Sequence, residues 1–409
     1  MAEIEPFPGI FYRVPEEDLP KVLAPPYDVI PPPYQEELYA RDPRNIVRVI
    51  LNRRPGDEAY LEAGETFRGW REEGLLAADR EPALYVLEQA FAAEGRTLRR
   101  FGLFARFRAE DPEKRVVLPH EHTRPVARED RYKVLLATRA NFSPIFLMFP
   151  DPESRFVAVV AAVVAEPPVL RYTDDGGVGH RLWRLTDAAT VDGLRKLLGG
   201  QKAYIADGHH RYATALRYRD AHGEDGAFTL GYFTPMGAPG LVVLPYHRIL
   251  TEGPSLEEAR SRLGRHFELA NAPDVAAGAA AVAASQRPYA FALAQPGAGA
   301  LVAESRPEVE SLLPAVTPPS LRALDTYLLH QAVLGPLLGV PDAAVSYVHS
   351  LAEAREAVDK GQCRLAVLLR GTPVSQIVDV AEARESMPAK STFFHPKLPS
   401  GLVIHPLAV

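Results

Sequence analysis

The stretch Lys202-Ala-Tyr-Ile-Ala-Asp207-Gly208-His209-His210-Arg211-Tyr-Ala-Thr-Ala-Leu216 decides how the first half of the chain is interpreted. Residues 202–207 are typical of a short strand, and the residues after Gly208 are typical of a helix that ends at Gly223. Asp207 and Gly208 lie between the two, where a tight turn is needed. The sequence therefore predicts a strand–turn–helix unit whose helix begins in a cluster of polar residues.

The beginning of that helix has the properties of an anion site. The first turn of a helix leaves backbone N–H groups unpaired, and the helix dipole adds partial positive charge there. Gly208 has no Cβ, so a ligand can approach the backbone closely. His209, His210 and Arg211 add donors, and arginine binds phosphate in a bidentate manner. We expect a phosphate here; the alternative is that Asp207 only caps the helix and the histidines lie on the surface.

Asp207 would repel a phosphate unless it has a role of its own. In phosphoryl transfer an aspartate accepts a hydroxyl proton or holds Mg²⁺. We therefore interpret Asp207 as a catalytic base or a magnesium contact, with His209 as a second catalytic candidate.

Composition sets the class of protein. The chain has 409 residues and a net charge of −6, which suits two or three domains and argues against nucleic-acid and membrane partners. Its one cysteine, Cys363, cannot form an internal disulfide. The N-terminus lacks a signal-peptide pattern, and the longest apolar run, 156–165, is too short for a membrane span and is expected to be buried. We expect a cytoplasmic enzyme.

Strands and helices alternate along the chain without a regular βαβ rhythm, which predicts a mixed α/β (α+β) fold. The character of the sequence changes near residue 250, so we predict a phosphate-binding region over 1–250 and a second α/β domain over 251–409. Helices are expected from residue 35 and over 57–73, 129–139, 274–285 and 321–339, and strands over 83–91, 97–109, 144–149, 289–294, 300–305 and 365–371. Turns are expected at 93–95 and 174–177, and 24–34 is expected to be an extended proline-rich loop.

A second polar cluster lies in LPHEHTRP, residues 118–125. Glu121 is a candidate acid or base and Arg124 a candidate phosphate contact. His120 and His122 have a spacing that occurs in zinc sites, but neither an HExxH helix nor cysteine partners accompany them. The alternative is a solvated loop that precedes a helix.

Further candidates come from three other segments. Lys133, Arg139 and Asn141 would bind a nucleotide, or the two cations would only solvate a helix face. Asp28, with Tyr27, would recognise a substrate ammonium or hydroxyl, or the prolines around them would only brace a domain contact. In the closing segment Lys390, Ser391, Thr392 and Lys397 could contact phosphate; we interpret it as a structural strand with Lys390 as the exception. Trp70 and Trp183 are assigned to the core.

Four motifs together resemble one family over nearly the whole chain. They are APPYDVI, LPHEHTRPVAREDRYKVLLATRANFSPIF, ADGHHRY and MPAKSTFFHPKLPSGLV, and the family is called domain of unknown function 1015. The family name implies no activity.

The turn Asp-Gly-His-His-Arg also resembles the phosphate-binding turn of the ParB/sulfiredoxin superfamily, which implies a ParB/sulfiredoxin-like core. Sulfiredoxins have a catalytic cysteine where this chain has His209, and Cys363 lies in an unrelated segment. Chromosome-partition CTPases usually have Glu and Arg in place of His209 and His210 and need a helix-turn-helix domain, for which the sequence offers no candidate. The free L-serine kinases are more similar, with Asp-Gly-His followed shortly by Arg.

That resemblance implies a kinase that transfers phosphate from ATP or ADP, with Mg²⁺, to a small hydroxyl metabolite such as free serine. It implies that Asp207 is the base or metal contact and that Gly208, His209, His210 and Arg211 bind phosphate. Two other functions stay open: a nucleotide sensor without catalysis, and a metal-dependent phosphohydrolase that uses the histidines. A homo-oligomer is also left open.

Overall fold

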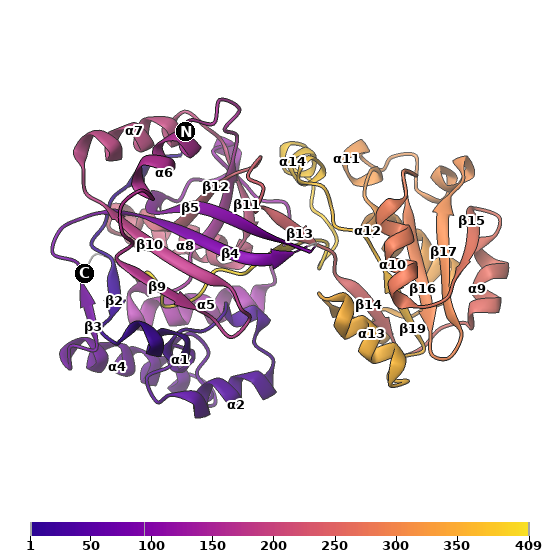
Figure 1. Cartoon of the computed structure of the whole chain (residues 1–409), viewed down its shortest axis with the longest axis horizontal. Helices are drawn as coiled ribbons and strands as arrows, with labels where there is room; N and C mark the ends of the chain where they lie inside the picture. Colours follow the sequence, from indigo (N-terminus) through magenta and orange to yellow (C-terminus); the bar gives the residue numbers. More distant parts are fainter. Residues whose placement is uncertain (1, 94, 408–409) are drawn as a thin grey trace. The chain divides into compact units, whose positions relative to one another are not determined.

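The computed structural model describes residues 2–93 and 95–407, and the chain divides into two compact units. The first contains the chain up to Pro119, Thr123–Val242 and the C-terminal segment from Pro396. The second contains His120–His122 and Val243–His395. Each unit has its own sheet covered by helices, so the predicted mixed α/β class is confirmed (Figure 1). The main division between the units lies at Val242, and the last segment of the chain returns to the first unit.

A mixed sheet runs through the first unit in the order β6-β11-β8-β12-β5-β4-β10-β9, and β1 also pairs with β5. β4 and β5 form the long antiparallel pair expected from the sequence; Glu94, in the predicted turn between them, lies outside the described residues. β12 pairs antiparallel with β5 and parallel with β8. The strands are β1 (Ile4–Glu5), β4 (Leu84–Ala93), β5 (Arg96–Arg108), β6 (Val117–Leu118), β8 (Ile145–Phe149), β9 (Leu170–Thr173), β10 (Gly179–Leu185), β11 (Ala203–Asp207) and β12 (Phe228–Pro235).

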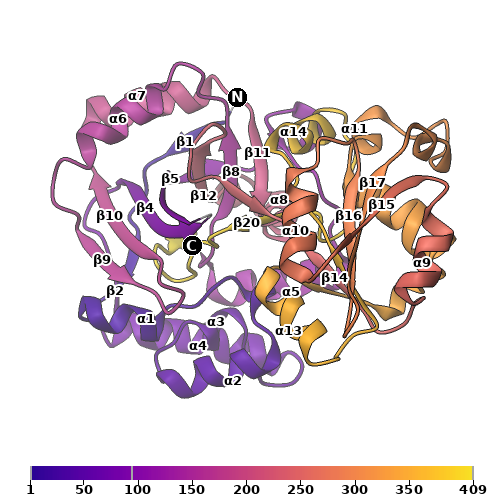
Figure 2. The same cartoon turned by 45° about the vertical axis from the view of Figure 1, so that its right-hand side comes forward.

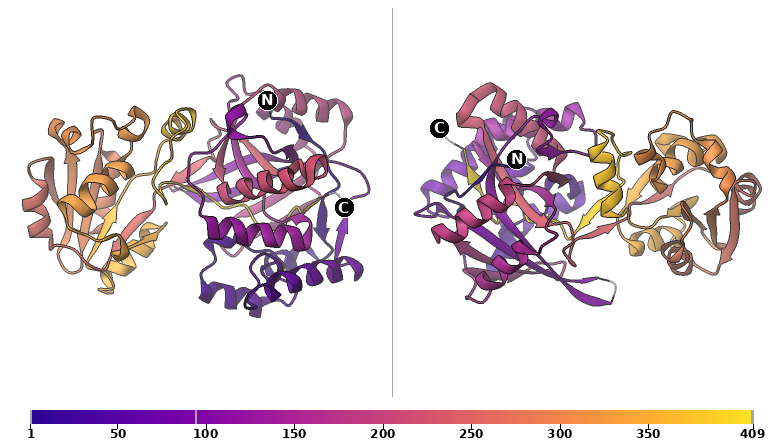
Figure 3. Two further views of the ribbon diagram at one scale, coloured as in Figure 1. Left: turned by 180° about the vertical axis from the view of Figure 1, so that it is seen from behind. Right: turned by 90° about the horizontal axis from the view of Figure 1, so that it is seen from above.

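Two helices carry much of the predicted polar sequence of this unit. α5 (Pro125–Thr138) and α8 (His209–His222) pack beside each other, and α8 also contacts β8 and β12 (Figure 3). Tyr212 and Ala215 of α8 join the core that fills the unit. The remaining helices are α1 (Leu19–Val22), α2 (Pro32–Arg41), α3 (Val47–Ile50), α4 (Glu58–Glu72), α6 (Arg155–Val163) and α7 (Ala188–Gly199), and the short strand pairs are β2 (Ile10–Tyr12) with β3 (Leu76–Ala78) and β7 (Ala140–Asn141) with β21 (His405–Pro406).

Two local expectations for this unit were wrong. The proline-rich segment 24–34 is not extended throughout, because α2 already begins at Pro32. Proline is tolerated in the first helical turn, where its missing N–H has no intrahelical partner to lose. The apolar run 156–165 forms α6 but is not buried throughout: Phe156 and Val160 face the core, whereas Val157 is 54% exposed. Trp70 and Trp183 are buried, as expected.

The second unit is a sheet with helices on both faces. Its strands follow the order β15-β17-β16-β19-β14-β18. The strand β16 lies between α9 on one side and α10 and α13 on the other (Figure 2). Its alternate residues divide between two cores: Ala290, Ala292 and Ala294 pack with α10 and α13, while Phe291 and Leu293 pack with α9. The elements are β14 (His247–Leu250), α9 (Leu256–Leu263), β15 (Phe267–Ala272), α10 (Val275–Ala284), β16 (Ala290–Gln295), β17 (Gly299–Ser305), β18 (Val345–Val348), α13 (Leu351–Asp359), β19 (Leu365–Leu368) and α14 (Val374–Glu382), with β13 (Val242–Leu244) paired to β20 (Phe393–His395).

The long amphipathic helix expected over 321–339 was wrong in form. The chain makes α11 (Pro319–Arg322), an extended residue at Leu324, α12 (Asp325–Leu328) and then a π-helical segment over Leu329–Leu337. The apolar spacing was read correctly as core-facing, since Leu328, Leu329 and Val333 are buried. The spacing of apolar residues does not reveal that the backbone of Leu324 is extended. Within the described residues, no helix combines the length and apolarity needed to cross a membrane.

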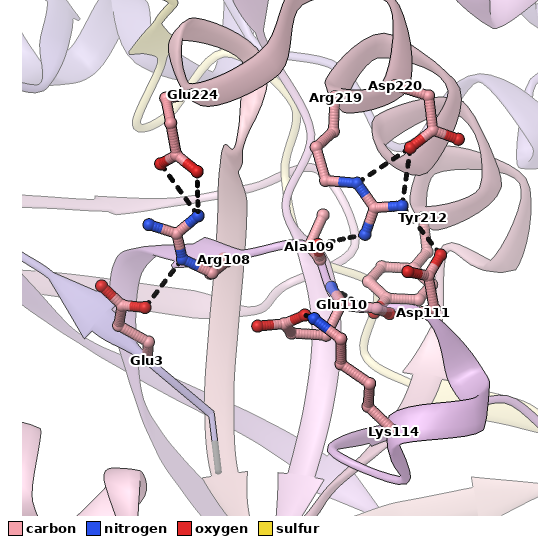
Figure 4. Close-up of polar contacts among 10 residues, drawn as sticks. All are labelled: Glu3, Arg108, Ala109, Glu110, Asp111, Lys114, Tyr212, Arg219, Asp220 and Glu224. Atoms are coloured by element: carbon pink, nitrogen blue, oxygen red, sulfur yellow. Dashed lines mark hydrogen bonds and ion pairs between the residues drawn. The ribbon is translucent and has the colours of Figure 1, made fainter.

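The C-terminal half of α8 is fixed to the end of β5 by a polar network (Figure 4). The Arg219 guanidinium donates to the Ala109 carbonyl at 2.8 Å and to the Asp111 carboxylate at 2.7 Å. The Glu110 N–H donates to the Tyr212 hydroxyl at 3.1 Å, and nearby Arg108 pairs with Glu3. The network therefore holds the helix whose opposite end carries the predicted phosphate site.

Arg219→Ala is expected to lower the free energy of unfolding by about 2 kcal/mol, because it removes a partly buried hydrogen bond to a carbonyl and a partly buried ion pair. Chemical denaturation of the full chain measures this loss. Arg155→Ala is the matched control: Arg155 pairs with Glu153 where both side chains are 66% exposed, and its loss is expected to be within about 0.5 kcal/mol. Equal effects of the two substitutions would contradict the anchoring role.

Candidate active site

The predicted strand–turn–helix is present in the first unit. β11 ends at Asp207, Gly208 adopts φ +95°, and α8 begins at His209. The pairing of β11 with β8 shifts between Ile205 and Asp207, which makes a β-bulge at Ala206. Bulges redirect side chains and are frequent beside active sites. Here the irregularity directly precedes the aspartate.

Asp207 is held by two cations. Its Oδ1 accepts from Lys397 Nζ at 2.7 Å and its Oδ2 from Arg211 Nη2 at 2.6 Å. Arg211 also donates to the Pro144 carbonyl, and its guanidinium lies against Gly208, where an added Cβ would stand 3.0 Å from Cζ. The three charged side chains are only 11–15% exposed. Glycine at position 208 therefore serves both the left-handed turn and the close approach of Arg211.

The ion pairs set the charge state of Asp207. Burial acts to raise the pKa of this carboxyl, but the positive charges of Lys397 and Arg211 outweigh burial and hold the pKa well below its usual range. Asp207 is therefore a carboxylate at neutral pH. A base this weak takes up a proton poorly, since effective general bases have a pKa near the working pH.

A third cation lies in the same region. Arg100 of β5 is fully buried, donates to the Pro396 carbonyl at 2.5 Å and stacks its guanidinium 4.7 Å from the centre of the Phe146 ring. Burial lowers its pKa, and the negative charge of Asp207 is among the influences that oppose this. Lys397 and Arg211 thus pair with one carboxylate, and the charge of that carboxylate also acts on Arg100, so the positive charges near the α8 N-terminus outnumber the one of Asp207.

His210 links this turn to two other predicted segments. Its Nε2 accepts from the backbone N–H of Arg124 at 3.0 Å, which places the ring proton on Nδ1. Burial lowers the pKa of His210, the nearby Asp28 carboxylate opposes that shift, and Arg124 and Arg211 add to it. His210 is therefore a neutral donor at pH 7. His209, beside it, is buried, with 6% of its surface exposed.

A cavity adjoins the turn within the first unit. Two contacts order polar side chains of its lining. The Arg131 guanidinium lies 3.9 Å from the centre of the Tyr27 ring, and Ser143 Oγ is 2.6 Å from Ser400 Oγ. The lining residues are Tyr27, Ile50, Arg131, Val134, Leu135, Ala140, Asn141, Phe142, Ser143, Ile145, Arg211, Thr214 and Thr229. The structure thus brings together Tyr27, Asn141 and Arg211, which the sequence could not connect.

Other predicted residues of this unit have structural partners. Asn141 lines the cavity, but its Oδ1 accepts from the Leu230 N–H at 3.2 Å and lies 3.0 Å from His405 Nδ1. Lys133 extends to Asp57, with 2.5 Å between Nζ and Oδ1. Arg139 ends α5 in the left-handed conformation and is exposed. Lys133 and Arg139 do not line the cavity.

His405 makes stability depend on pH. Burial and Arg106 lower the pKa of His405 to about 3. The unfolded chain binds a proton near pH 6.5 while the folded chain does not, so stability is full above that pH and is lost as pH falls toward the folded pKa, by about 1.4 kcal/mol per pH unit. Urea unfolding between pH 7 and pH 5 should show a slope that is smaller by one proton in His405→Gln; an unchanged slope would contradict the assignment.

Two predicted site residues belong to the second unit. Glu121 forms a β-bridge with Met387, and the neighbouring His120 has its Nε2 3.4 Å from Thr392 Oγ1. Lys390 has φ +59° and places its Nζ 5.0 Å from the centre of the Tyr246 ring. The motif LPHEHTRP is therefore divided, with Arg124 in the first unit and Glu121 in the second.

Sequence reasoning did not assign Arg100 or Lys397 to the site. Lys397 was considered as a phosphate contact, but Lys390 was preferred. Arg100 had a detectable signal: it occupies an inward position of β5, between the buried Leu98 and Gly102, where a charge is unexpected. Among the residues that the structure describes, no group of three or more His, Cys, Asp and Glu side chains is placed to hold a metal ion.

Comparison with known proteins identifies the family of the chain. The chain belongs to the family described as protein of unknown function (DUF1015), whose model matches residues 4–327, so the resemblance inferred from the motifs is confirmed. A search of curated proteins finds no match.

Solved structures similar to this chain include a free serine kinase in complex with AMP, at 13% identity and TM-score 0.36, covering 75% of this chain and 91% of that one. A mutant of free serine kinase in complex with ADP has 12% identity and TM-score 0.37, covering 75% and 92%. A conserved hypothetical protein from Pyrococcus furiosus has 13% identity and TM-score 0.35, covering 73% and 93%. The resemblance of the turn to the ParB/sulfiredoxin superfamily stays a prediction.

Proposed function

We propose that the first unit binds the phosphates of ATP or ADP at the N-terminus of α8 and transfers a phosphoryl group to a small hydroxyl metabolite. The observation that carries the proposal is the pairing of both Lys397 and Arg211 with Asp207, directly beside the first turn of the helix. A buried cluster with this excess of positive charge is costly in a free protein and favourable once an oxyanion is bound.

The contacts to phosphate follow from the geometry. The N–H groups at the start of α8 have no intrahelical partners, and Gly208 leaves them open to approach. Arg211 and Lys397 supply charge, and His210 supplies a neutral donor through Nδ1. Arg211 now contacts Gly208 and Pro144, so a phosphate would share its guanidinium with those groups. Arg124, Lys133 and Arg139 remain proposed contacts for the rest of the nucleotide.

The acceptor would occupy the adjoining cavity. Tyr27 lines it, and Asp28 lies close enough to His210 to influence its pKa. The Asp28 carboxylate, beside the cavity, would bind the ammonium of an amino alcohol, and free L-serine is the first acceptor to test because the turn resembles that of the free serine kinases. Glu121 and Lys390 belong to the second unit and take no part in this proposal.

In the transfer, the acceptor hydroxyl oxygen forms a bond to the terminal phosphorus, and the bond from that phosphorus to the bridging oxygen breaks. The leaving nucleotide keeps the electron pair, and the hydroxyl loses its proton. Both oxygens of Asp207 bind cations, so the residues fit a phosphate better than a protein-bound Mg²⁺, which we treat as part of the nucleotide substrate. Asp207 can accept the proton only after Lys397 turns to the phosphate, because that removes one of the two charges that depress its pKa.

One observation favours a nucleotide sensor as the second candidate. Both carboxylate oxygens of Asp207 are held by cations, and the low pKa that results makes Asp207 a poor base in the free protein, which suits binding without transfer.

A product-detecting assay combined with a thermal-shift measurement separates the candidate functions. Wild-type protein with Mg²⁺, ATP or ADP, and L-serine or other amino alcohols is expected to form a phosphorylated acceptor, detected by mass spectrometry. Arg211→Ala should weaken nucleotide binding by about tenfold or more. A rise in melting temperature without any product supports the sensor, and inorganic phosphate released without an acceptor supports a hydrolase. No response to any nucleotide rejects the proposal.

A further inference from the structure

The second unit contains a fully buried arginine whose partners are all uncharged. Arg248 lies on β14, with 0% of its surface exposed. Its Nε and Nη2 lie 3.2 and 3.1 Å from His330 Nε2, Nη1 donates to the Tyr246 carbonyl, and Nη2 donates to the Lys390 carbonyl at 3.3 Å. Burial and the charge of Arg248 lower the pKa of His330 to about 4, so that ring is neutral. Among the described residues, Arg248 forms no ion pair with a carboxylate.

That arrangement is unusual for a buried cation. Arg370 in the same unit is only partly buried, yet it pairs with the Asp325 carboxylate at 2.7 Å. Removing a guanidinium from water without an anionic partner is costly, because neutral acceptors recover only part of the lost solvation. Burial accordingly lowers the pKa of Arg248 to about 10. A bound anion would supply the missing charge.

A second cation lies on the same backbone segment that Arg248 binds. Lys390, whose carbonyl accepts from Arg248, has φ +59°, a conformation that a non-glycine residue adopts at a cost. Its Nζ lies 3.5 Å from the Tyr246 hydroxyl and 5.0 Å from the centre of that ring. Within the described part of the chain, Lys390 forms no ion pair. The strained turn at Lys390 therefore places a second positive group on the segment bound by Arg248, whose own charge has no anionic partner.

His330 reaches Arg248 from an unusual helix. It belongs to the π-helical segment Leu329–Leu337, and its ring stacks near Tyr347, whose ring centre lies 5.3 Å from Arg248 Cζ. π-helical turns are rare and occur frequently at functional sites. The buried charge, the strained lysine and the π-helix are independent features, and all three meet at Arg248.

We propose that Arg248 and Lys390 form an oxyanion-binding site of the second unit, for a phosphate or carboxylate group. The Lys390 ammonium contacts the anion, with Tyr246 beside it, while Arg248 supplies positive charge from behind and His330 holds the guanidinium. This site uses none of the residues of the proposed phosphate site at Asp207, and it does not depend on the kinase proposal.

The test uses the full chain and the ring signals of His330 in NMR spectra, identified by their absence in His330→Gln. Inorganic phosphate and acetate are titrated separately, at constant ionic strength set with chloride. We expect a saturable shift of the His330 signals with at least one anion. Lys390→Gln should weaken that binding by about tenfold, the value of one charge-assisted hydrogen bond.

Lys360→Gln is the matched control, because it removes the same charge from an exposed pair with Glu356 on α13. The affinity of Lys360→Gln for the anion should equal that of the wild type within about twofold. Saturation by phosphate alone or acetate alone identifies the group recognised. The proposal is overturned if neither anion shifts the His330 signals, or if Lys390→Gln and Lys360→Gln bind alike.

Discussion

Asp207→Asn is expected to lower the free energy of unfolding by about 3 kcal/mol, and ADP is expected to raise the melting temperature of this variant more than that of the wild type. The substitution preserves shape but leaves Lys397 and Arg211 buried without their carboxylate. A bound phosphate then restores the balance of charge. Phosphoryl transfer is lost in the same variant, because the proposed base is absent.

The pH dependence gives this prediction a sign. The pKa of Asp207 lies below its unfolded value, so its contribution to stability is present above about pH 4 and is lost as pH falls further. Denaturation of Asp207→Asn should therefore lack that acid-dependent loss. Asp192→Asn, an exposed aspartate paired with Arg195, is the control and should leave both stability and ADP response unchanged. If Asp207→Asn were as stable as the wild type, the carboxylate would not be needed to offset the buried charges of Lys397 and Arg211, and the prediction would be wrong.

Lys397→Gln is expected to have the largest effect on binding, weakening ADP by about 10- to 100-fold, since it removes a charge-assisted contact in a buried site. Its effect on unfolding is expected to be smaller than that of Asp207→Asn, because Arg211 continues to pair with Asp207. Isothermal titration calorimetry with Mg²⁺ and ADP measures the affinity of each protein.

The control for this prediction is Lys196→Gln, which removes an exposed charge from α7 of the same unit. It should bind ADP like the wild type. If both lysine variants bind with wild-type affinity, Lys397 serves only to seat the C-terminal segment on Asp207, and the phosphate site must lie elsewhere.

Local chemistry made the turn predictable from the sequence. When a strand ends in Asp-Gly and a polar helix start follows, a tight turn is the expected connection. Gly208 has the left-handed backbone that this turn requires. The mixed class and most strands also followed from periodicity. The β-bulge at Ala206 was not predictable, because it arises from pairing with β8 rather than from the residues themselves.

The partners of Asp207 could not be predicted because they are distant in sequence. Lys397 lies 190 positions from Asp207 and reaches it only because the last segment returns to the first unit. Nothing in a short window of sequence separates Lys397 from Lys390, which is bound to Tyr246 instead. For the same reason, the division of LPHEHTRP between the two units could not be predicted from the sequence. Long-range topology, rather than residue type, decides these assignments.

The most direct test of the central claim is a crystal structure of the wild-type protein with ADP and Mg²⁺. The account predicts phosphate oxygens about 3 Å from the N–H groups at the start of α8 and from Lys397 Nζ, with Asp207 freed from at least one of its two cations. ADP bound with its phosphates away from Gly208 and Arg211, while Lys397 and Arg211 still pair with Asp207, would contradict it.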